Sequence, residues 1–384
     1  MRHLQGMLIA SSFVGMRMFL LLACSLALFR MRAVASDDWT VIRQNGRDYV
    51  TFTNVAHFYQ FPEYTRVNRT VSLHNKHTGI RAQAGTSDLF INGVRFFTDF
   101  PILTNGSDEL ISAMDVSKII EPIIRPNRVK NAHKIETVVL DPGHGGVDSG
   151  ATNRWGTEKA FALDVAQYAR LQLMHAGYKV EMTRSTDKSV ALEDRVAFAN
   201  IFPNSVFISV HFNTSGSAAG LESYSLAPAG VVSNAANEVA VADTRWCSGN
   251  SQDEQNVALA AAVHATVLSR LIMYDRGVKH ARFHVLRNVK VPAVLIECGF
   301  LSHAAEGQRI ATSLFRQQVG AAIATGIQNY DAAINFRANA PQTFAAAKTT
   351  LPLHSRPIGE PLTEYAPAGR SHQDTPSISI NGGE

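Results

Sequence analysis

Cysteine is scarce in this sequence of 384 residues. There are three cysteines, Cys24, Cys247 and Cys298, and the first lies in a stretch that we expect to be removed. The two that remain are too few for a disulfide framework, and their spacing does not fit a cysteine-based zinc knuckle. A small disulfide-rich fold is therefore excluded, while a single disulfide stays open.

Dense runs of basic charge are also lacking. The net charge is +4, and the lysines and arginines are scattered rather than clustered, so no nucleic-acid partner is expected. After the N-terminal region, no apolar segment reaches the roughly 20 residues that a membrane-spanning helix needs. Hydrophobic residues make up 46% and charged residues 18% of the chain, which is typical of a soluble globular protein.

The N-terminal 35 residues have the pattern of a signal peptide. Arg2 and Arg17 precede an apolar stretch at 18–29, and Ala33-Val34-Ala35 is a small-residue cleavage site. We therefore predict that residues 1–35 are removed on export to the periplasm or the cell exterior. The alternative is lipidation, because Leu21-Leu22-Ala23-Cys24 partly resembles a lipoprotein processing site; only then would the protein attach to a membrane.

The rest of the chain divides into three regions by pattern. Residues 36–126 read as short alternating segments broken by turn pairs, which predicts a small strand-rich module. Within it, Leu110–Ile123 has the spacing of a short helix that Pro126 should stop. A polar linker at 127–134 leads to the second region, 135–331. The third region, 332–384, is rich in Ala, Pro, Ser and Thr and is predicted to be a disordered tail.

Region 135–331 alternates between strand and helix patterns, which is typical of an α/β domain with helices flanking a sheet. The apolar face of the first long helix repeats at Ala162, Val165, Ala166, Ala169 and Leu173. Strands are predicted at 137–141, 180–183, 206–210 and 293–296, and helices at 158–176, 190–201, 256–273 and 314–330.

Two histidines follow directly on predicted apolar strands. His144 lies in Asp141-Pro142-Gly143-His144-Gly145-Gly146, and His211 lies at the end of Phe207–Val210. Ligands of open α/β sheets gather at the carboxyl ends of the strands, so these two imidazoles can converge. The glycine-rich turn could also be a phosphate-binding loop. However, neither the Gly-Lys-Ser/Thr motif of such a loop nor the three-glycine motif of dinucleotide-binding sites follows.

Two glutamates complete a candidate metal site. Glu158 begins a predicted helix, where macrodipole stabilisation alone could explain it. However, two histidines and one glutamate with a fourth position open to water form the ligand set of hydrolytic zinc sites. Glu297 ends the strand Val294–Ile296 and could reach a metal-bound water. Ordinary loop histidines and helix-end or strand-edge charges are the plain alternatives.

Region 135–330 resembles the zinc-dependent N-acetylmuramoyl-L-alanine amidases of the type that includes cell-separation and sporulation amidases, known as amidase type 3. The ordered motifs that carry this resemblance are Val138–Gly146 with Asp148 and Gly150, Glu158-Lys159, Thr183-Arg184 with Asp187, Arg195, Ser209–Asn213, Gly220–Tyr224 and Glu297–Ser302.

The resemblance implies an open twisted, mostly parallel sheet of about six strands with flanking helices. It implies that His144, Glu158 and His211 bind one zinc ion and that Glu297 is the catalytic acid/base. The implied reaction is hydrolysis of the amide bond between N-acetylmuramic acid and L-alanine in bacterial peptidoglycan, in wall remodelling or daughter-cell separation. The implied partners are peptidoglycan and, in some relatives, a protein activator.

Further candidates are less specific. Asn213, Arg184 and His284 could contact substrate, although the first two could simply hydrogen-bond local backbone. Glu238 lies in a long polar segment between Leu226 and Gln255; it could block the zinc site, as a helix does in some relatives, or lie in a solvated loop. The module at 36–126 loosely resembles small domains of cell-wall proteins, including copper-amine-oxidase N-terminal-like modules, and could target the wall or act as a spacer.

Two other functions remain open. A non-catalytic or autoinhibited peptidoglycan-binding regulator would keep the fold without turnover, but retention of the three ligands and Glu297 argues against it. A zinc peptidase would cut within the stem peptide, and product masses would distinguish it from an amidase.

Overall fold

The structure is a computed structural model that describes residues 39–234 and 244–336. The predicted signal peptide, Glu238 and residues 337–384 lie outside this part of the chain. All the helices and strands described below belong to the unit Val41–Glu384. Within the described residues, no helix is both long enough and apolar enough to cross a membrane.

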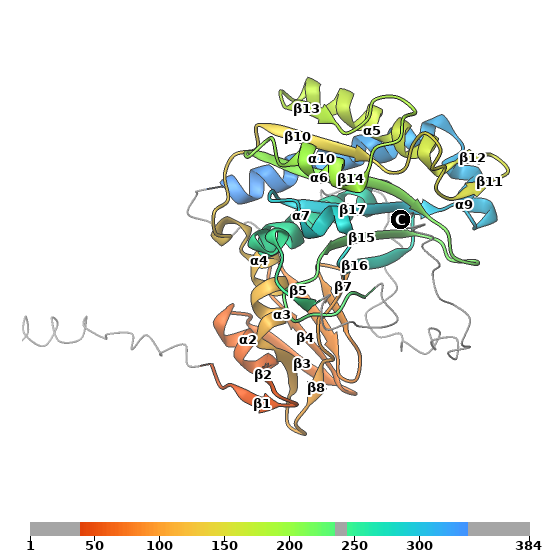
Figure 1. The fold of residues 1–384 in the computed structure, drawn as a ribbon. Helices are drawn as coiled ribbons and strands as arrows, with labels where there is room; N and C mark the ends of the chain where they lie inside the picture. Colours follow the sequence, from red (N-terminus) through yellow and green to blue (C-terminus); the bar gives the residue numbers. More distant parts are fainter. Residues whose placement is uncertain (1–38, 235–243, 337–384) are drawn as a thin grey trace, which may run out of the picture. The chain divides into compact units, whose positions relative to one another are not determined.

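Residues 135–331 form the α/β architecture that the sequence predicts (Figure 1). Six strands lie in the order β13-β10-β14-β17-β15-β16, and all neighbouring pairs are parallel except β15 with β17. The strands are β10 (Thr137–Pro142), β13 (Lys179–Met182), β14 (Ser205–Asn213), β15 (Leu221–Leu226), β16 (Asp275–Ala281) and β17 (Ala293–Phe300).

Helices cover the sheet on both sides because its central strands are apolar on both faces. The contacting helices α5, α7 and α10 cover one face, and α6 packs with α8 over a separate cluster that includes Phe207 and Leu295. The predicted apolar stripe of α5 is buried at all five positions. The helices are α5 (Glu158–His175), α6 (Leu192–Ala199), α7 (Asp253–Arg270), α8 (His284–Arg287), α9 (Ala304–Ile310) and α10 (Ser313–Asn335).

The N-terminal module is strand-rich, as predicted, but some of its strands join the sheet of the α/β part instead of forming a separate sheet. Its strand β7 pairs in parallel with β16 through Phe96 and Val278, so five module strands extend the sheet to eleven strands among the described residues. An unpaired strand edge is thereby covered. These strands are β3 (Glu63–Val67), β4 (Thr70–His74), β5 (Gly79–Gln83), β6 (Asp88–Ile91) and β7 (Val94–Phe97).

A second sheet of the module has the order β1-β2-β9-β8. Its strands are β1 (Ile42–Gln44), β2 (Arg47–Thr51), β8 (Leu103–Thr104) and β9 (Glu109–Ser112), and α2 (Phe52–Phe58) follows β2. The two-stranded ribbon of β11 (Thr152–Asn153) and β12 (Gly156–Thr157) precedes α5. Whether the module and the α/β part are separate domains stays a prediction.

The helix predicted over Leu110–Ile123 is wrong at its start. Leu110–Ser112 pair with β2 in β9, and the helical part comprises α3 (Ala113–Asp115), a π-helical turn (Val116–Ile120) and α4 (Glu121–Ile124). Short apolar runs fit a buried strand and a helix equally well, and pairing with β2 decides here. Ser112 then caps the helix, because its hydroxyl accepts a hydrogen bond from Asp115 N.

The last helix, α10, continues to Asn335, beyond residue 332, where the tail was expected to begin.

Candidate active site

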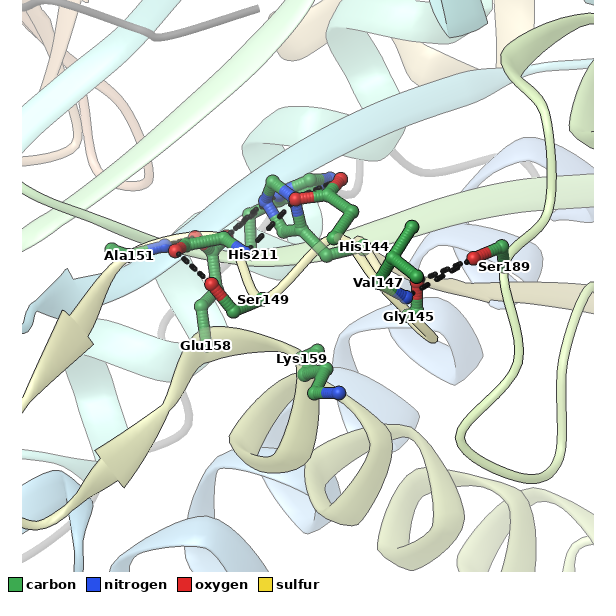
Figure 2. Close-up of polar contacts among 12 residues, drawn as sticks. His144, Gly145, Val147, Ser149, Ala151, Glu158, Lys159, Ser189 and His211 are labelled. Atoms are coloured by element: carbon green, nitrogen blue, oxygen red, sulfur yellow. Dashed lines mark hydrogen bonds and ion pairs between the residues drawn. The ribbon is translucent and has the colours of Figure 1, made fainter. Parts of the chain in front are cut away.

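Three donor side chains converge at the carboxyl ends of β10 and β14. His144 follows β10, Glu158 is the first residue of α5, and His211 lies near the end of β14. Their donor atoms lie within 4.8 Å of one another. His144 Nε2 is 3.1 Å and His211 Nδ1 is 2.9 Å from the same atom, Glu158 Oε1 (Figure 2). The structure thus brings together the three residues predicted as metal ligands.

Glycines make this close packing possible. A Cβ atom on Gly143 would lie 2.3 Å from the His211 ring, and one on Gly150 would lie 2.5 Å from Glu158 Oε2. His144 itself has a φ of +59°, a conformation that costs energy for a residue with a side chain and often occurs at functional sites. The loop is therefore shaped to point the His144 ring at Glu158.

Further hydrogen bonds orient the ligands. His144 Nδ1 lies 2.7 Å from Asp148 Oδ2, which leaves Nε2 facing Glu158. Glu158 also accepts hydrogen bonds from Ala151 N and Phe212 N, at 2.8 and 3.1 Å. Burial alone would raise the pKa of Glu158, but hydrogen bonds from the two histidines outweigh it and hold the pKa well below the usual range.

A buried ion pair supports the loop from below. Asp141 accepts hydrogen bonds from Arg195 Nη1 at 2.6 Å, Thr183 Oγ1 at 2.6 Å and Ser209 Oγ at 2.8 Å. Arg195 Nη2 also donates to the carbonyl oxygen of His144 at 2.8 Å. The position of the His144 backbone therefore depends on the pair of Asp141 and Arg195.

Arg184, a predicted substrate contact, is buried in the same support, with 1% exposure. It donates to the carbonyl oxygens of Pro142, Gly143 and Lys159 at 3.0, 2.7 and 2.7 Å. This guanidinium holds the loop and the start of α5 together. A contact with substrate stays a prediction that this placement does not favour.

The loop after His144 is held from outside as well. Ser189 Oγ donates to Gly145 O at 3.1 Å and accepts from Val147 N at 3.3 Å (Figure 2). Lys159 Nζ donates to Gly146 O at 2.6 Å and to Asp187 Oδ2 at 2.8 Å. These contacts leave the side chain of Val147 98% exposed beside the ligands.

Glu297 on β17 lies between β14, the strand that carries His211, and β15. The strand register pairs it with His211 on one side and with Glu222 on the other. Its residue exposure is 8%, and its Oε2 atom is buried with no hydrogen-bond partner in the described structure. Burial, followed by the charges of Glu158 and Glu222, raises the pKa of Glu297 well above the usual value. Such a carboxyl group is suited to proton transfer.

The other predicted substrate contacts, Asn213 and His284, have polar partners other than the three converging side chains. Asn213 Nδ2 donates to Glu222 Oε2 at 3.1 Å, and its own oxygen accepts from Thr214 N at 2.7 Å. His284 begins α8, and its Nε2 lies 3.5 Å from Glu193 Oε1. Substrate binding by Asn213 and His284 therefore stays a prediction.

Sequence reasoning missed one charged network beside Glu297. Glu222 is buried and accepts hydrogen bonds from Arg276 Nε at 2.8 Å and Lys279 Nζ at 2.6 Å, in addition to those from Asn213 and Tyr224. The signals in the sequence were the motif Gly220–Tyr224, for which no role was predicted, and the alternation of Glu222 and Tyr224 on a short strand. Nothing in the sequence indicated that residues 54 and 57 positions later would pair with it.

A second network has the bonding order of a serine-hydrolase triad but is not accessible. His264 Nδ1 lies 2.9 Å from Ser223 Oγ, and its Nε2 lies 3.0 Å from Asp275 Oδ1. Ser223 and His264 are both 0% exposed, so no substrate reaches the hydroxyl group. His264 is thus the hydrogen-bonded core residue that its apolar helix predicts.

Comparisons with known proteins match the α/β part of the chain. The sequence model of the N-acetylmuramoyl-L-alanine amidases matches residues 138–329, which is half of the chain. The N-acetylmuramoyl-L-alanine amidase AmiA of Escherichia coli is 29% identical over 250 residues, covering 59% of this chain and 86% of AmiA. AmiC of Neisseria meningitidis is 33% identical over 269 residues, covering 63% of this chain and 64% of AmiC.

One solved structure that matches is the amidase AmiC2 of Nostoc punctiforme. It is 30% identical, with a TM-score of 0.42, and the match covers 52% of this chain and 98% of AmiC2. His144, Glu158 and His211 all lie within residues 138–329, the range that the family model matches.

Proposed function

Because the chain belongs to the N-acetylmuramoyl-L-alanine amidase family, we propose that it hydrolyses the amide bond between N-acetylmuramic acid and L-alanine in bacterial peptidoglycan, using a zinc ion. The chain is a hydrolase of this family, and the names of its relatives state N-acetylmuramoyl-L-alanine amidase activity for them. The observation that carries the proposal is the convergence of His144, Glu158 and His211 beside the buried side chain of Glu297, whose Oε2 has no hydrogen-bond partner among the described residues.

The three converging side chains suit zinc. Two imidazoles and one carboxylate are a known donor set of catalytic zinc sites, and the hydrogen bond from His144 Nδ1 to Asp148 is of the kind that fixes a zinc-binding histidine. When bound, zinc would supply Lewis-acid chemistry, polarising a carbonyl oxygen and making a water molecule more acidic.

Glu297 is proposed to move the proton. As a carboxylate it takes a proton from the attacking water, whose oxygen forms a bond to the lactyl carbonyl carbon. The carbon–nitrogen bond then breaks, and Glu297 returns the proton to the departing L-alanine nitrogen. A raised pKa suits a group that takes and returns a proton in one turnover. The products are a lactyl carboxyl group on the glycan and a free stem peptide.

Two other functions are distinguished by products. A binding regulator would hold metal and peptidoglycan but release no product. The buried Oε2 of Glu297, which has no hydrogen-bond partner among the described residues, would then lower the stability of the fold with no gain in catalysis. A zinc peptidase would cut within the stem peptide. Export, wall association, an activating protein partner and a blocking role of Glu238 remain predictions from the sequence.

The test is mass spectrometry of purified peptidoglycan digested by the protein, with and without a chelator and with zinc restored. We expect intact stem peptides that start with L-alanine, loss of this product on metal removal, and recovery with zinc but not with magnesium. Shortened peptides still attached to glycan would indicate a peptidase. Metal-loaded protein that releases nothing would contradict the amidase proposal and favour a binding or autoinhibited protein.

A further inference from the structure

The charged network beside Glu297 extends the active-site face toward the N-terminal module. The register places Glu222 next to Glu297, and Tyr224 of β15 next to Lys279 of β16. Because side chains at paired positions point to the same face of a sheet, these groups continue the face that carries His211 and Glu297. The network therefore lies where a substrate bound at the metal ligands would extend.

The network has one more positive charge than negative. Arg276 and Lys279 both bond to Glu222 Oε1, at 2.8 and 2.6 Å, and Glu222 Oε2 is occupied by Asn213 and Tyr224. The side chain of Glu222 is 3% exposed, whereas those of Lys279 and Arg276 are 16% and 36% exposed. Glu222 is thus sealed off by its partners, while the surplus positive charge faces outward.

Arg276 keeps hydrogen-bonding capacity for a ligand. Within the described structure only its Nε has a hydrogen-bond acceptor, Glu222, so its two terminal nitrogens are available. Its guanidinium lies 4.8 Å from the centre of the Phe300 ring, which follows Glu297 by three positions on β17. A guanidinium held near an aromatic ring is suited to carboxylate groups, which it can bind through two parallel hydrogen bonds.

The N-terminal module forms one wall of this network. Lys279 Nζ lies 5.6 Å from the ring centre of Phe97 on β7 and 5.7 Å from that of Tyr224, so one aromatic ring comes from each part of the chain. Phe97 can approach because Gly277 has no Cβ; such an atom would lie 2.8 Å from the ring, and the φ of Gly277 is +91°. Arg95 of the module is paired with Asp88 at 2.7 Å and adds no net charge.

Among the described residues, the opposite side of the metal ligands has two exposed carboxylates but no pair of basic side chains like Arg276 and Lys279 around one carboxylate. Asp148 and Asp187 have side chains that are 62% and 56% exposed, and they bond to His144 and Lys159. Because Asp187 is paired with Lys159, that pair adds no net charge, and the surplus positive charge lies on the β16 side with Arg276 and Lys279. In peptidoglycan the glycan on the carbonyl side of the amide bond is uncharged, whereas the stem peptide carries carboxylates. Charge complementarity thus favours the stem peptide on the β16 side.

We propose that Arg276 and Lys279 form a subsite for the carboxylates of the stem peptide, with Phe97 of the N-terminal module as one wall. This inference rests on the proposed amidase function and adds to it the direction in which the substrate lies. It also gives the module a part in substrate binding. Because Arg276 is partly exposed, we expect a free carboxylate to improve binding by about tenfold, which corresponds to about 1.4 kcal/mol.

The experiment compares two synthetic N-acetylmuramoyl tripeptides, one with free peptide carboxylates and one with all of them amidated. Using the full chain, we expect kcat/KM to be about tenfold higher for the free acid, mainly through KM. Arg276→Gln should reduce this ratio to between one and about threefold while turnover of the amidated probe is kept. Phe97→Leu should reduce it less. Arg170→Gln, at an exposed position of α5, is the matched control and should leave the ratio unchanged.

A second arm does not depend on turnover. Binding of the two free tripeptides, acid and amide, is measured by calorimetry on wild-type protein and on Arg276→Gln. Preference for the acid that disappears in the variant supports the subsite even if neither muramoyl probe is cleaved, an outcome that would refute only the amidase proposal. Equal binding of acid and amide by the wild type would overturn the inference. If Arg276→Gln instead lowered kcat/KM equally for both muramoyl probes, Arg276 would have a structural role and the inference would also fail.

Discussion

Two buried carboxyl groups lie on β10 and β17, the strands on either side of β14, and their surroundings differ sharply. Asp141 on β10 is 1% exposed and accepts hydrogen bonds from Arg195, Thr183 and Ser209. Glu297 on β17 is 8% exposed, and its Oε2 has no partner among the described residues. Burial alone would raise both pKa values; the charge of Arg195 and the hydrogen bonds lower that of Asp141, and nothing comparable acts on Glu297.

This difference is the one expected between a supporting role for Asp141 and the chemical role that we propose for Glu297. A buried carboxylate with a full set of partners is fixed in charge and position, so it can hold the loop of His144 through Arg195. A buried carboxyl group without partners costs folding energy and is free to exchange a proton. Substitution by the amide should therefore reduce mainly activity at Glu297 and mainly stability at Asp141.

The largest effect is expected for Glu297→Gln. The amide keeps the size of the side chain but cannot transfer a proton, so we expect turnover to fall by about 10²- to 10⁴-fold. Bound zinc and the free energy of unfolding should be kept or slightly increased, because a neutral group replaces a poorly solvated carboxyl group. Release of stem peptides, zinc content and urea unfolding measure these three quantities. Wild-type turnover in this variant would disprove the proposed role of Glu297.

Asp141→Asn should instead lower the free energy of unfolding. The change leaves the guanidinium of Arg195, whose side chain is 4% exposed, without its counter-charge. Breaking a buried ion pair on one side costs about 3 kcal/mol of unfolding free energy. We expect urea unfolding at lower concentration and weaker zinc binding, because Arg195 also fixes the His144 carbonyl. Equal stability of Asp141→Asn and Glu297→Gln would mean that the two environments do not differ as described.

Much of the α/β part and its ligands could be predicted from sequence, for a physical reason. The strands that carry His144, His211 and Glu297 are short continuous apolar runs that end in polar residues, and the carboxyl edge of a parallel sheet brings such ends together. The convergence of the histidines on Glu158 therefore followed from local pattern and topology. The resemblance to the amidases named the reaction, which periodicity alone could not do.

The missed features depend on contacts between distant segments. Pairing of β7 with β16 rests on one pair, Phe96 with Val278, and nothing in either strand specifies its neighbour. Glu222 meets Arg276 and Lys279 only because β15 and β16 align. The sequence at Leu110–Ser112 was compatible with helix and strand, and pairing with β2 selected the strand. Local pattern thus predicts elements, while long-range pairing decides edges and charge networks.

A third buried carboxyl group, Asp115, sharpens the comparison. It is 0% exposed and accepts hydrogen bonds from Asp99 N and Ser112 Oγ, each at 2.6 Å. Asp99 in turn pairs with His280 at 2.5 Å. Burial and the negative charge of Asp99 raise the pKa of Asp115 to about 8. This residue lies in the N-terminal module, so a raised pKa by itself does not mark the catalytic group.

Asp115→Asn should change stability only as a function of pH. The folded pKa of Asp115 lies above its unfolded value of about 3.9. Its contribution to stability is therefore complete below about pH 4 and is lost as the pH rises toward 8. His280, whose pKa is raised by Asp99 against the effect of burial, acts in the same direction and remains in the variant. Asparagine mimics the protonated acid, so the variant should unfold like the wild type near pH 4 and resist urea better at pH 8, with unchanged turnover. If the wild type resisted urea better than the variant at pH 8, Asp115 would be ionised and stabilising there. Asp115 and Glu297 would then differ only in that Glu297 Oε2 has no hydrogen-bond partner among the described residues.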